Sequence, residues 1–301
     1  MPVSRIDLDG KGVGSPEGLV LKILKAEPAL SVPIPIEQLC RRLDISSIDY
    51  EALEGLEGAL ITNPEREFGT ILVKETSHRY RQRFTIGHEL GHFLIPTHMP
   101  GPDGRFLCSR ADMLLQHAAE QDKRARMEVE ANRFSSLILI PPPILRPKLK
   151  GDPSLEQLTN LALEFEVSKE AMARAYSQHH HEFLALVVTE NGKVRRIYKH
   201  LKFPYIVIDI GQAAPNGSLL SRSAPNRRRV TDIVESLPDH WISVERGKAA
   251  PKLYEQVMMQ RDNFAMTMLW IEFGNEDDDY DRDDDLTSKQ RYRDRMSRFS
   301  N

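Results

Sequence analysis

Two histidines and a glutamate lie close together in this 301-residue chain, at a spacing that suits a metal ion. His88, Glu89 and His92 occur within the run RFTIGHELGHFL. Residues four apart share one face of an α-helix, so the imidazoles of His88 and His92 can bind the same ion. Glu89 lies about 100° further round, where its carboxylate can act as a general base on a water at the metal. The pattern therefore predicts catalytic Zn²⁺ and hydrolysis.

The surroundings of this motif strengthen the prediction, because so short a pattern also arises by chance on a solvated helix face. Thr85 is the expected N-cap of the helix, and Pro96 is expected to end it soon after the second histidine. A broad apolar flank indicates a helix buried beside a cleft, and it consists of Phe84, Ile86, Leu90, Phe93 and Leu94.

A catalytic zinc needs a third protein ligand and an open position for water. The best candidate lies in the predicted helix ARMEVEANRFSSLILIP. Glu128 and Asn132 share one face of this helix, whereas Glu130 lies about 200° from Glu128. We predict that Glu128 binds the metal and that Asn132 bonds to an imidazole of the first helix. Glu130 is then expected to face solvent or to pair with Arg126 or Arg133.

Other side chains near the two motifs remain alternative ligands. Glu130 is the strongest competitor of Glu128, while His98 follows a proline in a predicted loop and His117 lies in a segment without a second anchor. The chain has two cysteines, Cys40 and Cys108, which suggests reduced thiols. Cys108 lies between the motifs, where its thiol could oxidise or cap the metal, although an inert thiol is the simpler interpretation.

At these residues the chain resembles the ImmA/IrrE family of metallopeptidases. The family's segments read RxRFTxAHELGH and then ExEANxFxxxLLxP, and here they read RQRFTIGHELGH and EVEANRF, with Gly87 where alanine is usual. The resemblance extends over roughly residues 15 to 180. It implies a zincin-like zinc protease of the cytoplasm that cuts, or promotes the cutting of, a helix-turn-helix repressor. Release of that repressor would derepress stress-response or mobile-element genes.

The segment before the metal-binding helix is expected to align the substrate. Residues 57–62 and 69–74 alternate weakly and predict short strands. In a zincin-like fold the strand before the helix lies at the cleft, where a substrate can add as a further strand. We therefore predict a substrate-binding edge that consists of Thr70, Ile71, Leu72 and Val73.

The proline-rich stretch 141–153 divides the chain, because its prolines prevent a continuous helix. We predict an α+β protein with a zincin-like metallopeptidase domain at 1–150, a helix-turn-helix-like segment at 151–181, an α+β domain at 182–275 and a disordered charged tail at 276–301. The α+β domain is expected to hold strands at 183–190, 194–200, 205–210, 239–245 and 264–272 and a helix near 227–236. Some family members carry a GAF-like sensory domain here, although no motif identifies a ligand.

Composition argues against a membrane or nucleic-acid protein. The chain is 40% apolar and 28% charged, which is the balance of an ordinary soluble protein. Its first residues lack the apolar core of a signal peptide, and we expect a cytoplasmic protein. The net charge of −3 offers no attraction to DNA, and the second helix of the helix-turn-helix-like pair presents only Lys169 and Arg174.

Two functions remain. In the first, His88, His92 and Glu128 hold zinc and Glu89 takes a proton from the attacking water, which amounts to peptide hydrolysis. In the second, a non-proteolytic regulator binds a repressor or antitoxin partner through a zincin-like scaffold. Pure binding needs no general base, so the presence of Glu89 favours the enzyme.

Overall fold

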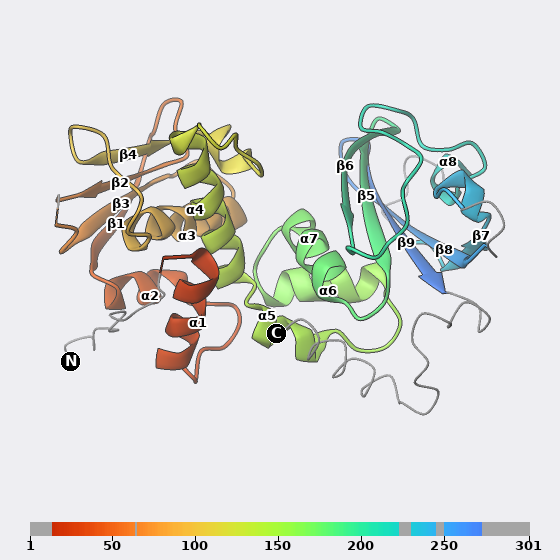
Figure 1. Cartoon of the computed structure of the whole chain (residues 1–301), viewed down its shortest axis with the longest axis horizontal. Coiled ribbons are helices and arrows are strands. Elements are labelled where there is room, and N and C mark those ends of the chain that lie inside the picture. Colours follow the sequence, from red (N-terminus) through yellow and green to blue (C-terminus); the bar gives the residue numbers. More distant parts are fainter. Residues whose placement is uncertain (1–13, 64, 223–229, 245–249, 273–301) are drawn as a thin grey trace. The chain divides into compact units, whose positions relative to one another are not determined.

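The computed structural model describes residues 14–63, 65–222, 230–244 and 250–272. The chain forms two compact units, each with one β-sheet (Figure 1). Residues 1–145 and 160–172 belong to the first unit, and residues 146–159 and 173–301 belong to the second. The predicted charged tail at 276–301 lies outside the described residues. Among the described residues, no helix combines the length and the apolar character needed to cross a membrane.

The sheet of the first unit has four strands in the order β1-β3-β2-β4. They are β1 (Ile45–Glu51), β2 (Gly58–Thr62), β3 (Gly69–Lys74) and β4 (Arg105–Cys108). The strands predicted at 57–62 and 69–74 are present as β2 and β3. β1 and β4 were not predicted, because the outward side chains of β1 are polar and β4 has only four residues.

The predicted substrate-binding edge is wrong, because β3 is an interior strand. It pairs in parallel with β1 and antiparallel with β2, so Thr70, for example, lies between Ser47 and Ile61. Its hydrogen-bonding groups therefore serve the sheet on both sides, and this applies to Thr70, Ile71, Leu72 and Val73. The last strand of the sheet on the β2 side is β4, which ends at Cys108.

The first unit also contains helices α1 (Pro16–Ala26), α2 (Ile36–Arg42), α3 (Arg79–Leu94) and α4 (Lys123–Leu139), with a 3-10 turn η1 (Asp112–Leu114). α3 carries the metal motif and packs on β2 and β3 and also against α4, while α1 packs on α4 (Figure 1). This arrangement places α3 in the interior of the unit.

α3 begins earlier than predicted. Its N-cap is His78, whose ring nitrogen accepts from the Tyr80 N–H at 3.2 Å, and Thr85 lies buried inside the helix. The apolar pattern starts only at residue 84, so it marks where the helix enters the core and not where it begins. The helix ends at Leu94, just before Pro96 as predicted, and the Arg66 guanidinium donates to the Ile95 carbonyl at 2.8 Å beyond that end.

Glycines lie where α3 makes its closest contacts with α4 and with β2. A Cβ at Gly87 would lie 2.7 Å from Ser135 Oγ of α4, and one at Gly91 would lie 3.2 Å from Ala131 Cα. On the sheet side, a Cβ at Gly58 of β2 would clash with Thr85 Cγ2 and lie 2.8 Å from Glu89 Oε1. Glycine at these positions therefore sets the spacing of β2, α3 and α4.

The second unit is built on an antiparallel sheet in the order β6-β5-β9-β8-β7. Its strands are β5 (Leu184–Glu190), β6 (Lys193–Lys199), β7 (Val234–Ser236), β8 (Lys252–Met259) and β9 (Phe264–Glu272). Asn191 and Gly192 join β5 to β6 with φ values of 51° and 74°, which two-residue hairpins favour. The strands predicted at 183–190, 194–200 and 264–272 are thus confirmed.

Three predictions for this unit are wrong. Residues 205–210 and the described residues 239–244 form no named strand and contribute only an isolated bridge between Ile206 and Ile242. The second segment begins within a 3-10 turn (Pro238–His240) that leads to the buried Trp241, and residue 245 lies outside the described part. The predicted helix at 227–236 ends in β7, and its first residues lie outside the described part. β8 was missed.

The remaining helices are short. α6 (Leu155–Glu164) and α7 (Lys169–His179) form the predicted helical pair, capped by the Ser154 and Ser168 hydroxyls, and are divided between the two units. The other helices and turns are α5 (Pro142–Leu145), η2 (Arg146–Lys148), α8 (Leu219–Arg222) and η3 (Pro238–His240).

We predict that Gly58→Ala lowers the free energy of unfolding by roughly 1–3 kcal/mol, because the methyl group overpacks the contact between β2 and α3. Urea titration measures the loss. Gly14→Ala is the matched control, because a Cβ there meets nothing within 4 Å. Equal stability of the two variants would show that the sheet and α3 have room to separate.

Candidate metal centre

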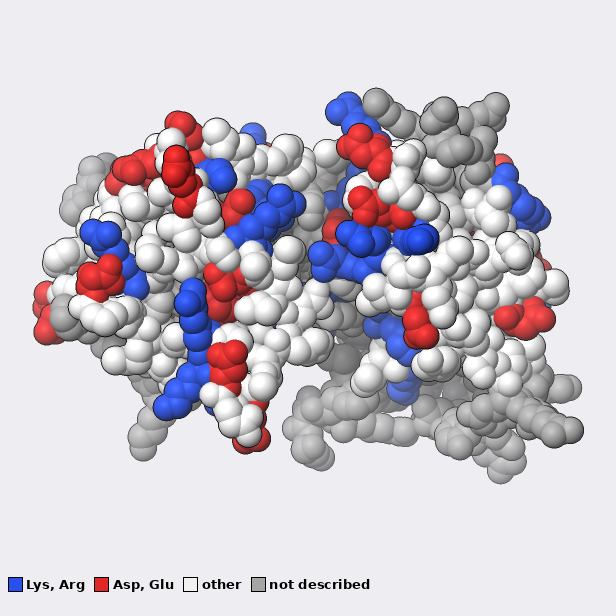
Figure 2. All heavy atoms as spheres, turned by 90° about the horizontal axis from the view of Figure 1, so that it is seen from above, with Lys and Arg blue, Asp and Glu red and all other residues white. Residues whose placement is uncertain are grey.

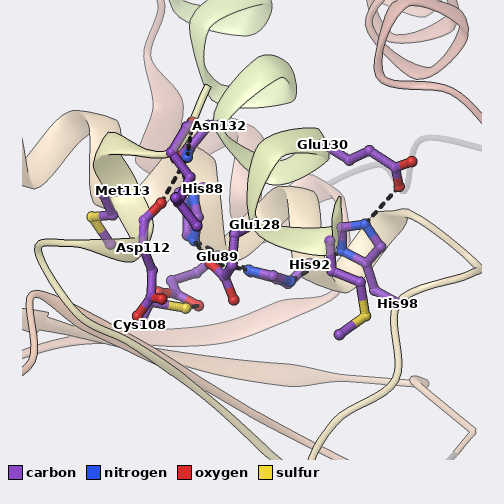
Figure 3. Close-up of polar contacts among 12 residues, drawn as sticks. His88, Glu89, His92, His98, Cys108, Asp112, Met113, Glu128, Glu130 and Asn132 are labelled. Atoms are coloured by element: carbon purple, nitrogen blue, oxygen red, sulfur yellow. Dashed lines mark hydrogen bonds and ion pairs between the residues drawn. The ribbon is translucent and has the colours of Figure 1, made fainter. Parts of the chain in front are cut away.

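Four side chains with metal-binding atoms meet in a buried cluster of the first unit. His88 and His92 come from α3, Glu128 from α4 and Cys108 from the end of β4 (Figure 3). The imidazole nitrogen, thiol sulfur and carboxylate oxygen that they offer all lie within 4.8 Å of one another. Three of these residues are the predicted ligands, and Cys108 is the alternative that the sequence left open.

The spacing of the three predicted ligand atoms fits a tetrahedral ion. His88 Nε2 lies 3.1 Å from His92 Nε2, and Glu128 Oε2 lies 3.2 Å and 3.4 Å from these two nitrogens. Zinc bonds of about 2.0–2.2 Å in tetrahedral geometry separate neighbouring ligand atoms by roughly 3.3 Å. Glu128 Oε2 is also buried and has no hydrogen-bond partner among the described residues. The site therefore fits a divalent cation.

Asn132 orients the first histidine, as predicted. Its Oδ1 accepts from His88 Nδ1 at 2.9 Å, which leaves Nε2 of that ring free of a proton and directed at the cluster. The amide cannot easily turn over, because Nδ2 donates to the carbonyls of Asp112 and Leu115 at 2.9 Å and 3.0 Å. The tautomer that binds metal is thus selected by a fixed hydrogen bond.

His98 and Glu130 orient the second histidine. His98 Nδ1 lies 3.0 Å from His92 Nδ1, and His98 Nε2 lies 3.0 Å from Glu130 Oε2 (Figure 3). If His98 Nε2 carries the proton and donates it to the Glu130 carboxylate, His98 Nδ1 accepts from His92 Nδ1. His92 Nε2 then carries no proton and directs its lone pair at the cluster. The carboxylate thereby sets both tautomers.

The structure also decides among the alternative ligands. Glu130 points away from the cluster to His98, and its side chain is 36% exposed, so it faces solvent in part as expected, whereas the expected pairing with Arg126 or Arg133 is wrong. The partner of Arg133 is instead Glu17, at 2.9 Å. His117 is exposed and lies outside the cluster.

Glu89 lies beside the cluster without joining it. Its side chain is fully buried, with Oε2 at 3.6 Å from Cys108 Sγ and Oε1 without a hydrogen-bond partner in the described part of the chain. Burial raises the pKa of this carboxyl to about 7, although His88 favours the charged form. A carboxylate with a pKa in this range suits a general base at neutral pH.

The other charges favour a cation at the centre. Burial lowers the pKa of His92 to about 3, so its ring is neutral. Burial works against the charged form of Glu128, but the nearby imidazole nitrogens of His88 and His92, at 3.2 Å and 3.4 Å, outweigh it and hold the pKa of that carboxyl below its usual value. Burial also lowers the pKa of His88, yet Glu128 and Glu89 raise it overall. These protonation states are consistent with a bound cation. It would lie beside a neutral His92 and an ionised Glu128 and take the place of the proton on His88.

Sequence reasoning missed the roles of three residues. The contact between His98 and Glu130 was not predicted, because it joins a loop to a helix 32 positions away. Asp112 was not considered, although its carbonyl holds Asn132 and its carboxylate accepts from the Ser109 N–H at 2.8 Å. The spacing SxxD from Ser109 to Asp112 was the available signal of this turn.

Comparisons with known proteins agree with the site. Residues 50–177 match the sequence model of the IrrE N-terminal-like domain. Among solved structures, a Mycobacterium tuberculosis transcriptional regulator is similar in fold, with a TM-score of 0.53, 13% identity, and coverage of 84% of this chain and 75% of that one. Identity this low shows a shared fold alone. No curated protein matches the chain.

We predict that Glu128→Ala removes most of the bound zinc, because it deletes one of three converging ligand atoms. Glu130→Ala should retain the metal with an affinity lowered by about 10- to 100-fold, since only the orientation of His92 loosens. Glu130→Gln should restore the affinity, because its amide oxygen still accepts from His98. Metal analysis and chelator competition measure both effects.

The opposite pattern, in which Glu130→Ala loses the metal and Glu128→Ala keeps it, would transfer the ligand role to Glu130. Circular dichroism of each variant separates loss of metal from loss of fold.

Proposed function

This chain belongs to the ImmA/IrrE family through the IrrE N-terminal-like domain of residues 50–177, and on that premise we propose that it is a regulatory zinc metallopeptidase. Its substrate in this proposal is a helix-turn-helix transcriptional repressor, whose cleavage derepresses stress-response or mobile-element genes. The observation that carries the proposal is the buried Glu89 carboxylate beside three converging ligand atoms. A protein that only bound its partner would have no use for such a base.

The proposed chemistry assigns each residue one task. His88, His92 and Glu128 hold the metal, which when bound acts as a Lewis acid and lowers the pKa of water to about 7. Glu89 accepts a proton from the attacking water and then delivers it to the leaving amine. Asn132 and His98 keep the two imidazoles in the required tautomer. Burial of the whole set strengthens these interactions, because little water screens them.

The outer strand β4 is our proposed site for the substrate segment. It is the last strand of the sheet on the side of β2, and it leads directly to the cluster at Cys108. An extended peptide can pair with an outer strand through main-chain hydrogen bonds, which align it without requiring a particular sequence. Leu107 of β4 is 47% exposed and offers an apolar contact to such a segment.

A protein partner fits the surface better than DNA does. Acidic and basic side chains are interspersed on the face drawn in Figure 2, and the chain carries a net charge of −3. DNA binding normally needs a face with clustered positive charge.

We propose that the second unit, with its antiparallel sheet, is a GAF-like sensory domain that controls the peptidase.

We predict that Glu89→Gln abolishes cleavage and leaves the metal in place. The amide keeps the size of the side chain but cannot accept a proton, a role that contributes about 10²- to 10⁴-fold in rate. Zinc-loaded protein is incubated with the helix-turn-helix repressors encoded beside its gene, and mass spectrometry identifies the products. Glu75→Gln, the same change at an exposed position of the same unit, is the control and should cleave normally.

A reporter for repressor release, read at equal protein levels in cells, separates cutting from binding. If Glu89→Gln relieves repression as fully as the unchanged protein does, the peptidase is not required and the non-proteolytic regulator takes its place.

A further inference from the structure

Cys108 belongs to the buried cluster, yet the proposed reaction gives it no task. We propose that its thiolate is a fourth ligand of the metal held by His88, His92 and Glu128, and that this bond keeps the site closed to water in the resting protein. The coordination stands on the structure alone, whereas its inhibitory effect rests on the proposed peptidase function.

The backbone holds Cys108 in place from both sides. In the register of the sheet it lies opposite Gly58, and its carbonyl accepts from the Glu57 N–H at 3.0 Å. The next residue, Ser109, donates its N–H and its hydroxyl to Asp112 Oδ2 at 2.8 Å and 2.6 Å. The sulfur therefore does not rely on a flexible loop for its position.

The same network connects Cys108 to the metal-binding histidine. The Asp112 carbonyl accepts from Asn132 Nδ2 at 2.9 Å, and Asn132 Oδ1 accepts from His88 Nδ1 at 2.9 Å. The turn that follows Cys108 and the imidazole of His88 are thus fixed to each other through one side chain. Two ligands from different elements are positioned together, as a preformed coordination site requires.

The donor set is suited to zinc. Thiolate, imidazole and carboxylate are all zinc ligands, and four of them in tetrahedral arrangement make a closed site. The ligand oxygen Glu128 Oε2 is buried and lacks a hydrogen-bond partner among the described residues, as does Glu89 Oε1 beside the cluster. An unpartnered buried oxygen among converging ligand atoms indicates that a cation completes the cluster.

Charge balance also favours the thiolate as a ligand. The Glu128 carboxylate and the Cys108 thiolate together neutralise a divalent cation, which reduces the cost of burying it. When the sulfur–metal bond forms, the S–H bond breaks, and the proton has a nearby acceptor in Glu89 Oε2 at 3.6 Å. A fourth protein ligand therefore removes the open position that an attacking water needs.

Cobalt reports on the sulfur directly. Thiolate ligation of Co²⁺ produces a charge-transfer band in the near ultraviolet, which nitrogen and oxygen ligands do not. The full-length protein loaded with one Co²⁺ should show this band, and Cys108→Ser should lose it while still binding the ion. Cys40→Ser is the matched control, because Cys40 is equally buried on α2 but lies outside the cluster. It should keep the band.

X-ray absorption of the unchanged protein loaded with zinc gives a second measurement that needs no variant. A zinc–sulfur distance of about 2.3 Å is expected, in addition to the shorter bonds to nitrogen and oxygen. Absence of both the cobalt band and the zinc–sulfur distance, at one metal per chain, would overturn the inference and leave the proposed peptidase untouched.

Hydrolysis of unfolded casein tests the inhibitory effect. Cys108→Ser should cleave casein faster than the unchanged protein and faster than Cys40→Ser. If the sulfur binds the metal but Cys108→Ser is no faster, the thiolate is a ligand without inhibiting, and that part of the inference fails. If the sulfur binds and no variant cleaves casein or a repressor, the coordination stands and the proposed function fails.

Discussion

The metal centre depends on how closely α3 is held between the sheet and α4. At Gly58 a strand residue lies against Thr85 and Glu89, and at Gly87 and Gly91 the second helix approaches to the distance of backbone contact. This spacing brings Glu128 of α4 within 3.4 Å of both imidazoles. Interiors are packed too tightly to absorb an added methyl group without a shift. The ligand distances are therefore a consequence of glycine positions that carry no chemistry themselves.

A second consequence of this packing is the burial of a polar network. Two histidines, two glutamates and a cysteine share a space with little access to water. Such groups cost free energy unless each finds a partner, and here Asn132 and His98 provide partners for the outer nitrogens of the two rings. The inner atoms converge on one another, and Glu128 Oε2 among them has no hydrogen-bond partner in the described part of the chain. Concentrating unsatisfied atoms at one point is unfavourable for a structural core and suitable for a cation site.

The network also extends from the centre to the edge of the sheet. Asn132 holds His88 and, through the Asp112 carbonyl, the turn that follows Cys108. Glu130, partly exposed on α4, reaches His92 through His98. A change in β4 or in the loop around His98 would therefore alter the ligands directly. This gives a physical route by which a bound partner could influence the metal, without requiring movement of α3.

Local periodicity could be read from the sequence, and it determined the parts of the site that lie on single helices. Helical spacing placed His88, Glu89 and His92, and the same geometry separated Glu128 from Glu130 and paired Asn132 with an imidazole. Family resemblance identified the domain. The hairpin at Asn191 and the helix caps at Ser154 and Ser168 followed from equally local rules.

Tertiary structure alone decided what joins distant segments. Strand order is not encoded in the order of strands along the chain, so β3 became an interior strand when the unpredicted β1 paired with it. Likewise, Cys108 entered the cluster because β4 pairs with β2, and His98 met Glu130 across a loop. Periodicity describes which face of an element is apolar, but it does not state which element will cover that face. The types and helical spacing of the ligands could therefore be predicted from the sequence. The contacts that hold these ligands in place depended on how distant segments packed.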